Sequence, residues 1–343
     1  MVAAPDLGSG AERRVGSSPI IRTKKLKAFK ITSWRLFSLY VREMKRHQLC
    51  CIGHITLDKV VTPQNTTYMP GGSAYYCSYA MRHFKDIDYA LVTAVGASEM
   101  HVVDQLREIG IDVTALPSKR SVYFENIYGE NPDDRTQRVL AKADPFTVSQ
   151  LHEVEAEIYH LGSLLADDFS LEAIKALSHK GLVAVDSQGY LREVHETNVY
   201  PVDWSNKREA LPYIHFLKVN ELEMEVLTGL SDPRRAAEKL HEWGVKEVLV
   251  TLGSMGSLIY DGITFHRIPA YKPKEIIDAT GCGDTYTIGY LYQRVLGAGI
   301  EEAGQFAAAM STLKIERSGP FCGSKSDVIQ CIEKAEANKP QTS

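Results

Sequence analysis

At 343 residues, the chain is long enough to bury the core of one large α/β domain or of two smaller ones. Its composition, 44% hydrophobic and 24% charged, is typical of a globular enzyme, and its net charge of −4 argues against nucleic acid as a partner. No uninterrupted apolar stretch approaches the length that spans a bilayer, so we expect no membrane partner. The six cysteines show no C-x-x-C spacing, which favours a reducing, cytoplasmic compartment over a disulfide framework or a zinc site.

Residues 1–43 differ from the rest of the chain because they carry nine basic and only three acidic residues. Residues 25–41 can form a basic amphipathic helix, which leaves a targeting peptide or a membrane-surface helix open. A strand-like run begins soon after Met44, so we favour an upstream extension with Met44 as the working start. We therefore expect a non-core extension over 1–43, one domain over 44–338 and a tail over 339–343.

The apolar periodicity predicts an alternation of strands and helices. In chain order we expect a strand over 49–60, a turn over 69–73, a helix over 74–84, a strand over 89–95, a helix over 100–109, and strands over 113–116, 121–128 and 136–141. Further strands are expected over 158–161, 182–186, 214–219, 247–252, 258–260 and 265–268, with helices over 171–178, 221–228, 233–243, 284–295, 302–316 and 327–337.

This alternation of strands and helices is typical of parallel crossover connections. It predicts an α/β fold with a doubly wound, mostly parallel sheet flanked by helices. The strands near 57–69 and 121–141 do not fit that winding, so we expect them to form a small sheet that acts as a lid.

The stretch from Asp278 to Asp284 reads D-A-T-G-C-G-D and stands directly before an apolar, helix-compatible run. Its glycines allow backbone N–H groups to approach an anion, and the helix start adds partial positive charge. Asp284 can cap the helix or offer a proton-accepting oxygen beside that anion. An anion cradle beside a carboxylate base is what phosphoryl transfer to a hydroxyl requires, although this stretch alone leaves a plain N-cap and turn equally open.

Other expected strands also end in polar residues and glycines, at the edge where an open α/β sheet binds its ligands. Asn220 and Glu223 can present an amide and a carboxylate to the waters of Mg²⁺ and to phosphate, or can form only a capping box. Thr251, Gly253 and Gly256 can receive a nucleotide phosphate, or can form an ordinary turn at a strand end.

Asp58, at the end of the first expected strand, can bind substrate hydroxyls or be a solvated strand end. Gly71 and Gly72 precede a helix and allow a substrate to approach the backbone. The run from Asp186 to Arg192 can supply polar side chains to the same rim, or can form a turn with an Asp–Arg pair. The sequence contains no P-loop, G-x-G-x-x-G, G-x-S-x-G or H-E-x-x-H motif in a suitable place, which argues against those enzyme classes.

In this order, the motifs resemble the ribokinase-like (PfkB) family of small-molecule kinases over residues 49–332. The family usually shows D-T-x-G-A-G-D where this chain has Ala279 and Cys282. The resemblance implies ATP and Mg²⁺ as cofactors, a monovalent-cation site near Ala279, an adenine pocket around 308–312, and a homodimer through the lid as in some relatives. It implies these roles: Asp284 as general base, the backbone of Gly281, Cys282 and Gly283 as anion hole, Asn220 and Glu223 with Mg²⁺ (Glu223 through water), Thr251, Gly253 and Gly256 with ATP, and Asp58, Gly71 and Gly72 with the substrate.

The substrate end departs from ribokinase itself, since Ser73 and Tyr76 stand where those kinases carry the two asparagines of G-G-N-x-x-N. The loss of two amides argues against ribose. The run D-x-Q-G-x-x-R from Asp186 to Arg192 is similar to a subgroup that includes plant inositol kinases and some microbial nucleoside kinases. We therefore expect a sugar or polyol kinase, and keep a nucleoside kinase and a catalytically silent ligand-binding protein as alternatives.

Overall fold

The computed structural model describes residues 46–129 and 135–337. The expectations for the extension over 1–43 and the tail over 339–343 lie outside these residues. The described strands belong to two sheets, one of nine strands and one of six. None of the described helices combines the length and the apolar character that crossing a membrane needs.

The nine-stranded sheet confirms the expected doubly wound, mostly parallel architecture. Its order is β15-β14-β13-β12-β9-β8-β1-β4-β5. Every neighbouring pair from β13 to β5 is parallel, and β14 and β15 extend one edge antiparallel. In chain order its strands are β1 (His47–Gly53), β4 (Tyr89–Val95), β5 (Asp112–Pro117), β8 (Ala156–Gly162), β9 (Leu182–Asp186), β12 (Phe216–Asn220), β13 (Glu247–Thr251), β14 (Ser257–Tyr260) and β15 (Phe265–Ile268).

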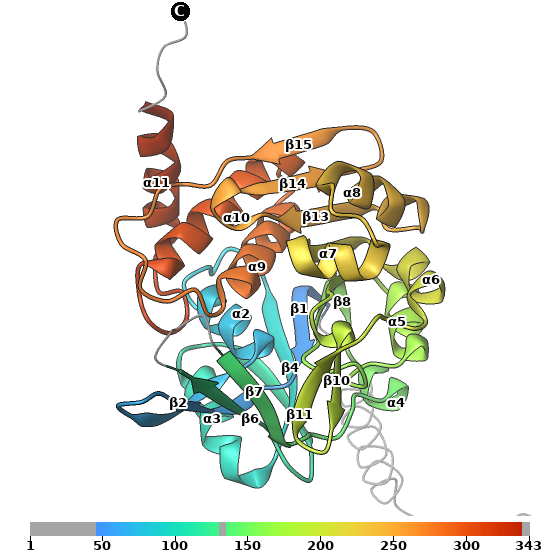
Figure 1. The fold of residues 1–343 in the computed structure, drawn as a ribbon, viewed down its shortest axis with the longest axis vertical. Coiled ribbons are helices and arrows are strands. Elements are labelled where there is room, and N and C mark those ends of the chain that lie inside the picture. The colour runs from blue at the N-terminus through green and yellow to red at the C-terminus, as the bar shows by residue number, and fades with distance from the viewer. Residues whose placement is uncertain (1–45, 130–134, 338–343) are drawn as a thin grey trace, which may run out of the picture. The chain divides into compact units, whose positions relative to one another are not determined.

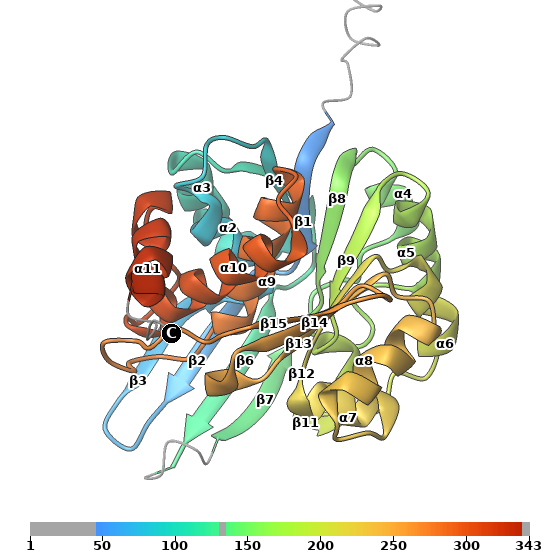
Figure 2. The same ribbon diagram turned by 90° about the horizontal axis from the view of Figure 1, so that it is seen from above.

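Helices cover both faces of this sheet (Figures 1 and 2). One face carries α2 (Ser73–Met81), α3 (Met100–Glu108), α9 (Cys282–Val295), α10 (Ile300–Ile315) and α11 (Lys325–Ala337). The other face carries α4 (Val148–Leu151), α5 (Leu171–Ser178), α6 (Lys207–Ala210), α7 (Glu221–Thr228) and α8 (Pro233–Glu242). The strands are apolar on both sides for this reason: in β1, Leu49 and Cys51 join one buried cluster while Cys50 and Ile52 join the other.

The six-stranded sheet, which we call the lid sheet, has the order β10-β11-β7-β6-β2-β3. Its strands are β2 (Thr56–Val61), β3 (Thr66–Gly71), β6 (Val122–Tyr128), β7 (Arg135–Ala141), β10 (Arg192–His195) and β11 (Asn198–Pro201). Strands thus form near 57–69 and 121–141, where the sequence pattern placed them. The pattern did not reveal β10 and β11, because a hairpin of two four-residue strands shows too little periodicity.

Two local expectations were wrong. The strand expected over 49–60 is two strands in different sheets, because the chain leaves the main sheet after Gly53 and the Ile55 N–H donates to Thr93 Oγ1 at 3.1 Å. The turn expected over 69–73 is mostly strand, since β3 continues to Gly71 and pairs it with Thr56. The remaining expected elements form, with ends shifted by at most three residues. The short helices α4 and α6 were not expected.

Candidate active site

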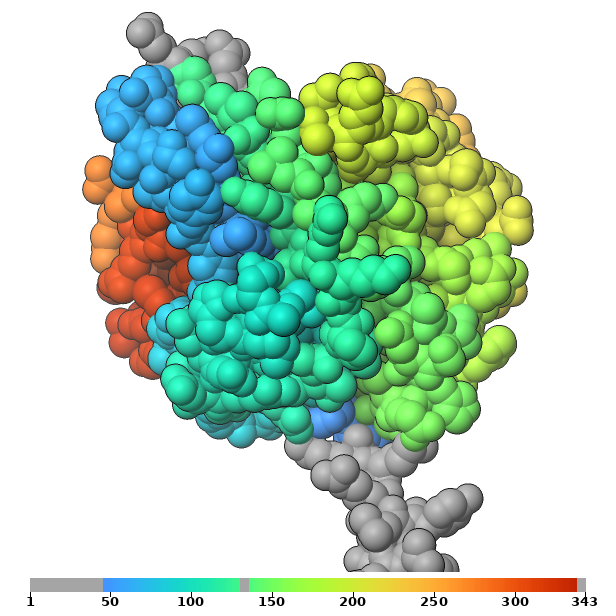
Figure 3. Space-filling model, turned by 90° about the horizontal axis from the view of Figure 1, so that it is seen from below, coloured from blue at the N-terminus to red at the C-terminus, as the bar shows by residue number. Residues whose placement is uncertain are grey.

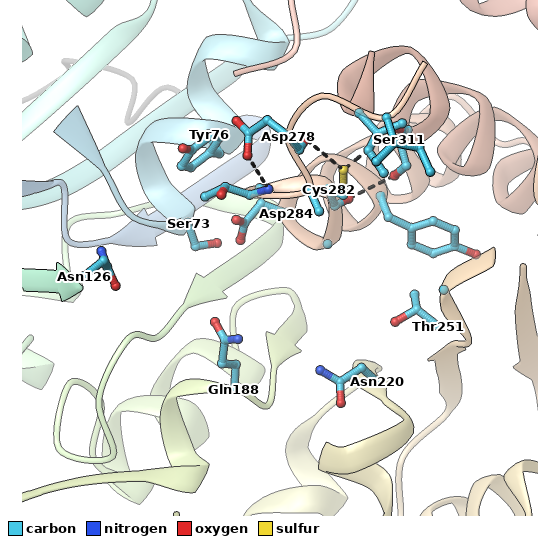
Figure 4. Close-up of a pocket in the computed structure, with 18 of the residues that line it drawn as sticks. Ser73, Tyr76, Asn126, Gln188, Asn220, Thr251, Asp278, Cys282, Asp284 and Ser311 are labelled. Atoms are coloured by element: carbon cyan, nitrogen blue, oxygen red, sulfur yellow. Dashed lines mark hydrogen bonds between the residues drawn. The ribbon is translucent and has the colours of Figure 1, made fainter. Parts of the chain in front are cut away.

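A cavity of about 1490 Å³ lies between the lid sheet and the carboxyl ends of the main strands. Figure 4 shows its labelled polar side chains converging from both sheets and from the start of α9. The predicted residues that line it are Asp58, Gly72, Asn220, Thr251, Gly253, Gly256, Gly281, Cys282, Gly283 and Asp284. Gly71 and Glu223 are not part of the lining. The fold therefore brings together residues that are more than 200 positions apart in the chain.

The start of α9 is shaped by Gly281, which has a left-handed backbone with φ of 76°. A Cβ atom at Gly281 would lie 2.3 Å from Cδ1 of Tyr76, so only glycine fits against that ring. The first N–H groups of a helix lack intrahelical acceptors, so α9 presents donors and its positive dipole end at this point. The N–H of Cys282 already donates to the Ala279 carbonyl at 3.2 Å, so it contributes less to an anion hole than the sequence suggested.

Asp284 lies one turn into α9, at the wall of the cavity. Burial raises the pKa of its carboxyl group above the ordinary value, and the nearby charge of Asp186 raises it further. A hydrogen bond from the Ser73 hydroxyl and the positive charge of Lys218 oppose this rise in pKa. A carboxylate with a raised pKa is a stronger proton acceptor than an ordinary aspartate.

Lys218 was not singled out from the sequence, yet it lies beside Asp284 and lines the cavity. Its side chain is only 7% exposed, and its Nζ lies 3.1 Å from Asp186 Oδ2 and 3.8 Å from Glu223 Oε2. Burial alone would lower the pKa of Lys218, but Asp186 and Glu223 outweigh it and raise that pKa. The ammonium group also lies 3.2 Å from where a Cβ of Gly283 would be. The sequence signal that could have identified Lys218 is its place within an otherwise apolar strand, where a charged side chain is unexpected.

Asn220 and Glu223 form the capping box that their spacing left open. Asn220 Oδ1 accepts from the Glu223 N–H at 2.9 Å, and Glu223 Oε2 accepts from the Asn220 N–H at 2.9 Å. Glu223 Oε1 also accepts from the Asn220 amide at 2.7 Å. Asn220 therefore reaches the cavity, while the Glu223 carboxylate is turned behind it, with a side chain that is 7% exposed.

The charge of this region fits a divalent cation. The carboxylates of Asp186, Glu223 and Asp284 surround a single ammonium group, that of Lys218, so the cluster carries excess negative charge when all three are ionised. Burial raises the pKa of Glu223, which Lys218 partly offsets. Carboxylate and amide oxygens are ligands that suit Mg²⁺, directly or through its waters.

The residues predicted for the nucleotide line the other end of the cavity. Thr251 Oγ1 donates to the Val219 carbonyl at 3.3 Å, and Gly253 and Gly256 follow it. Residues of α10 within the predicted range 308–312 lie on the same wall, and Tyr271 completes it. The lining thus continues past the strand ends, with apolar and polar groups that suit a planar base.

The lid sheet forms the opposite wall. Asp58 lies within β2 rather than at a strand end, and its Oδ1 accepts from Thr56 Oγ1 at 2.6 Å. A Cβ atom at Gly71 would lie 2.3 Å from Asp58 Oδ2, so Gly71 makes room for this carboxylate instead of contacting the cavity. Asn126 and Gln137, which no sequence motif marked, also line the cavity and share a hydrogen bond of 2.9 Å across the β6–β7 hairpin. The run from Asp186 to Arg192, which was expected to supply polar side chains to the rim, lines the cavity with Asp186, Gln188 and Arg192.

All six cysteines lie within the described residues and are free thiols. Two of them, Cys51 and Cys77, meet the buried His160, with Sγ–Nδ1 distances of 3.5 and 3.8 Å. Burial raises the pKa of the Cys77 thiol, which disfavours the thiolate that a metal ion requires. His160 Nε2, the other ring nitrogen, is buried without a hydrogen-bond partner among the described residues.

Comparison with known proteins agrees with this geometry. The family model described as "pfkB family carbohydrate kinase" matches residues 46–324. The chain is 29% identical over 264 residues to a cytidine kinase of Thermococcus kodakarensis, covering 74% of this chain and 91% of that protein.

Two solved structures resemble the fold closely. A sulfate complex of a pyrophosphate-dependent kinase in the ribokinase family has a TM-score of 0.75 and 29% identity, covering 82% of this chain and 99% of that one. A pyrophosphate-dependent kinase of that family complexed with a pyrophosphate analog and myo-inositol has a TM-score of 0.74 and 28% identity, covering 84% and 100%. With its fold, its ordered motifs and a family match over most of its length, the chain belongs to the pfkB family of carbohydrate kinases.

Proposed function

We propose that this kinase transfers the γ-phosphoryl group of ATP to a hydroxyl group of a sugar or polyol. The observation that carries the proposal is the position of Asp284. Its carboxyl group, with a raised pKa, lies at the start of α9 between the lid wall and the nucleotide wall of one cavity. An acceptor hydroxyl and a donor phosphate that enter from opposite ends meet at this residue.

In the proposed reaction, Asp284 accepts the proton of the acceptor hydroxyl, and the oxygen of that hydroxyl forms a bond to the γ-phosphorus of ATP. The bond between this phosphorus and the β–γ bridging oxygen breaks at the same time, and ADP leaves. The N–H groups of Gly281 and Gly283, with a smaller share from Cys282, stabilise the charge on the transferred group. Lys218 adds a positive charge beside them.

Bound Mg²⁺ would neutralise charge on the donor phosphates. Asp186 and Asn220 reach the cavity and would hold the waters of this ion. Glu223 was predicted to meet Mg²⁺ through water; both of its oxygens accept hydrogen bonds from Asn220, so we propose that it acts mainly by orienting that amide.

The acceptor end of the cavity suits a polyhydroxylated molecule, because Asp58 and Asn126 of the lid sheet and Gln188 after β9 offer carboxylate and amide groups for adjacent hydroxyls. A neighbour bound to myo-inositol agrees with a polyol. A nucleoside acceptor is the second candidate, favoured by the similarity to a cytidine kinase and by the Phe124 ring in the lining. ATP is the proposed donor because the lining extends along α10, although two neighbours are described as pyrophosphate-dependent.

The direct test is phosphoryl transfer with ATP or pyrophosphate as donor and Mg²⁺, against a panel of sugars, inositols and nucleosides. We expect acceptor-dependent ADP release that falls by roughly 10²–10⁴-fold in Asp284→Asn, a variant that keeps the side-chain shape. Its melting temperature serves as the control for folding. Unchanged turnover in Asp284→Asn contradicts the base role. Nucleotide-induced thermal stabilisation without turnover by the unmodified enzyme supports the ligand-binding alternative instead.

We also propose that the lid sheet pairs with a second copy of the chain. The strand β3 is an edge of this sheet, and Tyr68 on it is 60% exposed. Figure 3 shows the β2–β3 segment, in blue, at the margin of the surface. An unpaired strand edge is a template for another strand. Sedimentation of the enzyme and of a Tyr68→Lys variant tests this pairing, and a monomer in both samples contradicts it.

The cytoplasmic location of the protein stays a prediction.

A further inference from the structure

A buried ammonium group lies behind the anion-hole loop, outside the cavity lining. It belongs to Lys314 near the end of α10, whose side chain is 0% exposed. Its Nζ donates to the backbone carbonyl of Asp278 at 2.7 Å and to the Arg317 carbonyl at 3.5 Å, and lies 3.1 Å from Asp278 Oδ2. A charge this deeply buried persists only when oxygen atoms surround it. These oxygens come from two loops, one that enters α9 and one that leaves α10.

The same contacts hold the loop that leads into the anion hole. Asp278 Oδ1 accepts from the Thr280 N–H at 2.9 Å, and Oδ2 accepts from the Gly319 N–H at 3.2 Å. The backbone N–H groups of 277 and 278 both donate to the Ile315 carbonyl. Gly281 follows only three residues after Asp278. Lys314 is thus the cation at the centre of a junction that sets where α9 and its N–H groups begin.

A monovalent cation was expected at this place from the family resemblance, close to Ala279. The residues present do not fit such an ion, since the Asp278 carbonyl and carboxylate oxygens that would bind it already hold the Lys314 ammonium. An ammonium group is a compact single positive charge that three oxygen atoms can surround, much like K⁺. The chain therefore supplies the charge covalently at this junction.

We propose that Lys314 is a built-in replacement for a monovalent cation: it positions the anion-hole loop of residues 278–284, so that phosphoryl transfer needs no K⁺. Lys314 is a positioning residue, because it acts through Asp278 and does not line the cavity. The kinetic part of this inference rests on the proposed kinase function. Its thermal part does not, which keeps the two separable.

The experiment compares two substitutions that both remove the charge. Lys314→Ala leaves a hole that a small cation can enter, whereas Lys314→Met keeps most of the volume filled. Rates are measured in KCl, NH₄Cl or choline chloride at equal ionic strength. We expect the unmodified enzyme to work equally well in all three salts. In choline chloride both variants lose kcat by about 10-fold to about 100-fold, because a displaced loop misplaces the reacting groups. KCl or NH₄Cl then restores Lys314→Ala with a saturable dependence and leaves Lys314→Met impaired.

Lys180 offers a matched control, since its Nζ also donates to backbone carbonyls, at 2.7 Å to His152 and 3.3 Å to Leu151, and it does not line the cavity. Lys180→Met is expected to lose stability without any cation-dependent change in rate. A purely structural role of Lys314 predicts the same behaviour for Lys314→Met and Lys314→Ala. Rescue of Lys314→Ala alone by a small cation distinguishes the two roles.

Thermal unfolding supplies a readout that needs no turnover. KCl should raise the melting temperature of Lys314→Ala relative to choline chloride, and should leave that of the unmodified enzyme and Lys180→Met unchanged. Activation of the unmodified enzyme by K⁺, or full activity of both Lys314 variants in choline chloride, overturns the proposal. If Lys314→Ala does not fold in any salt, the kcat of Lys314→Met in choline chloride tests the proposal. A kcat equal to that of the unmodified enzyme then overturns the proposal. Absence of turnover by the unmodified enzyme contradicts the kinase proposal. The effect of KCl on the melting temperature of Lys314→Ala then tests the cation-replacement proposal by itself.

Discussion

The two walls of the cavity are supported by charged groups that differ in burial. At the start of α9, the charged groups are buried between helices and main-sheet strands, where Lys218 is 7% exposed and Lys314 is fully buried. The ion pairs of the lid sheet lie outside the cavity lining: Lys59 and Arg138 hold Glu125 at 2.8 and 3.0 Å, and their side chains are 27% and 39% exposed. Exposed ion pairs contribute little to stability, whereas a buried pair is costly to break.

This difference indicates that the two walls have different roles in the proposed reaction. The buried wall is rigid enough to place a proton acceptor, an ammonium group and helix N–H donors with the precision that phosphoryl transfer needs. The lid wall has a less deeply buried framework and is free to vary with the acceptor that it meets. We therefore expect changes in the buried wall to act on kcat and changes in the lid wall to act on the acceptor KM.

The change expected to have the largest effect is Lys218→Met, in the buried wall. It removes the positive charge beside the anion hole, so we expect kcat to fall by roughly 10²–10³-fold. Loss of this charge also raises the pKa of Asp284 further, which moves the acid limb of the pH–rate profile to higher pH. Steady-state kinetics across a pH series measure both effects. If Lys218→Met changed only the KM for the acceptor, the expected distinction, in which the buried wall acts on kcat and the lid wall on acceptor KM, would be wrong.

An intermediate effect is expected from Asp58→Asn, in the lid wall. The variant keeps the shape but loses the charge that strengthens hydrogen bonds to substrate hydroxyls, so kcat/KM for the acceptor should fall by about 10-fold to 100-fold. The KM for the donor should stay the same, because the nucleotide wall is untouched. Asp167→Asn, an exposed aspartate outside the cavity lining, is the control. A fall in kcat with both KM values unchanged would contradict the assignment to the acceptor.

The smallest effect is expected from Ser73→Ala. The Ser73 hydroxyl donates a hydrogen bond that lowers the pKa of Asp284, so its loss raises a pKa that burial has already raised. The active form of the base is the carboxylate, so activity should be lost at a higher pH as the solution is acidified. We expect a shift of about one pH unit or less, with nearly the same rate at high pH. A shift toward lower pH would mean that Ser73 does not stabilise the ionised base.

Much of the fold could be predicted from the sequence because its signals are local. Alternating strands and helices follow from apolar periodicity, and β4, β9, α5 and α7 begin and end where the pattern placed them. The break between β1 and β2 was missed, since the residues on both sides read as one apolar strand. What divides them is a contact with Thr93, almost 40 residues away.

The candidate site divides along the same line. The sequence by itself determined that the run from Asp278 to Asp284 holds a turn, a helix start and a carboxylate, because these features depend on neighbouring residues. Only the tertiary structure decided that Lys218 and Lys314 are buried cations, that Asn126 and Gln137 reach the cavity from the lid, and that Glu223 lies behind Asn220. Burial and ion pairing arise where distant segments pack, and a lysine 36 residues from Asp278 carries no local sign of the carboxylate that it meets.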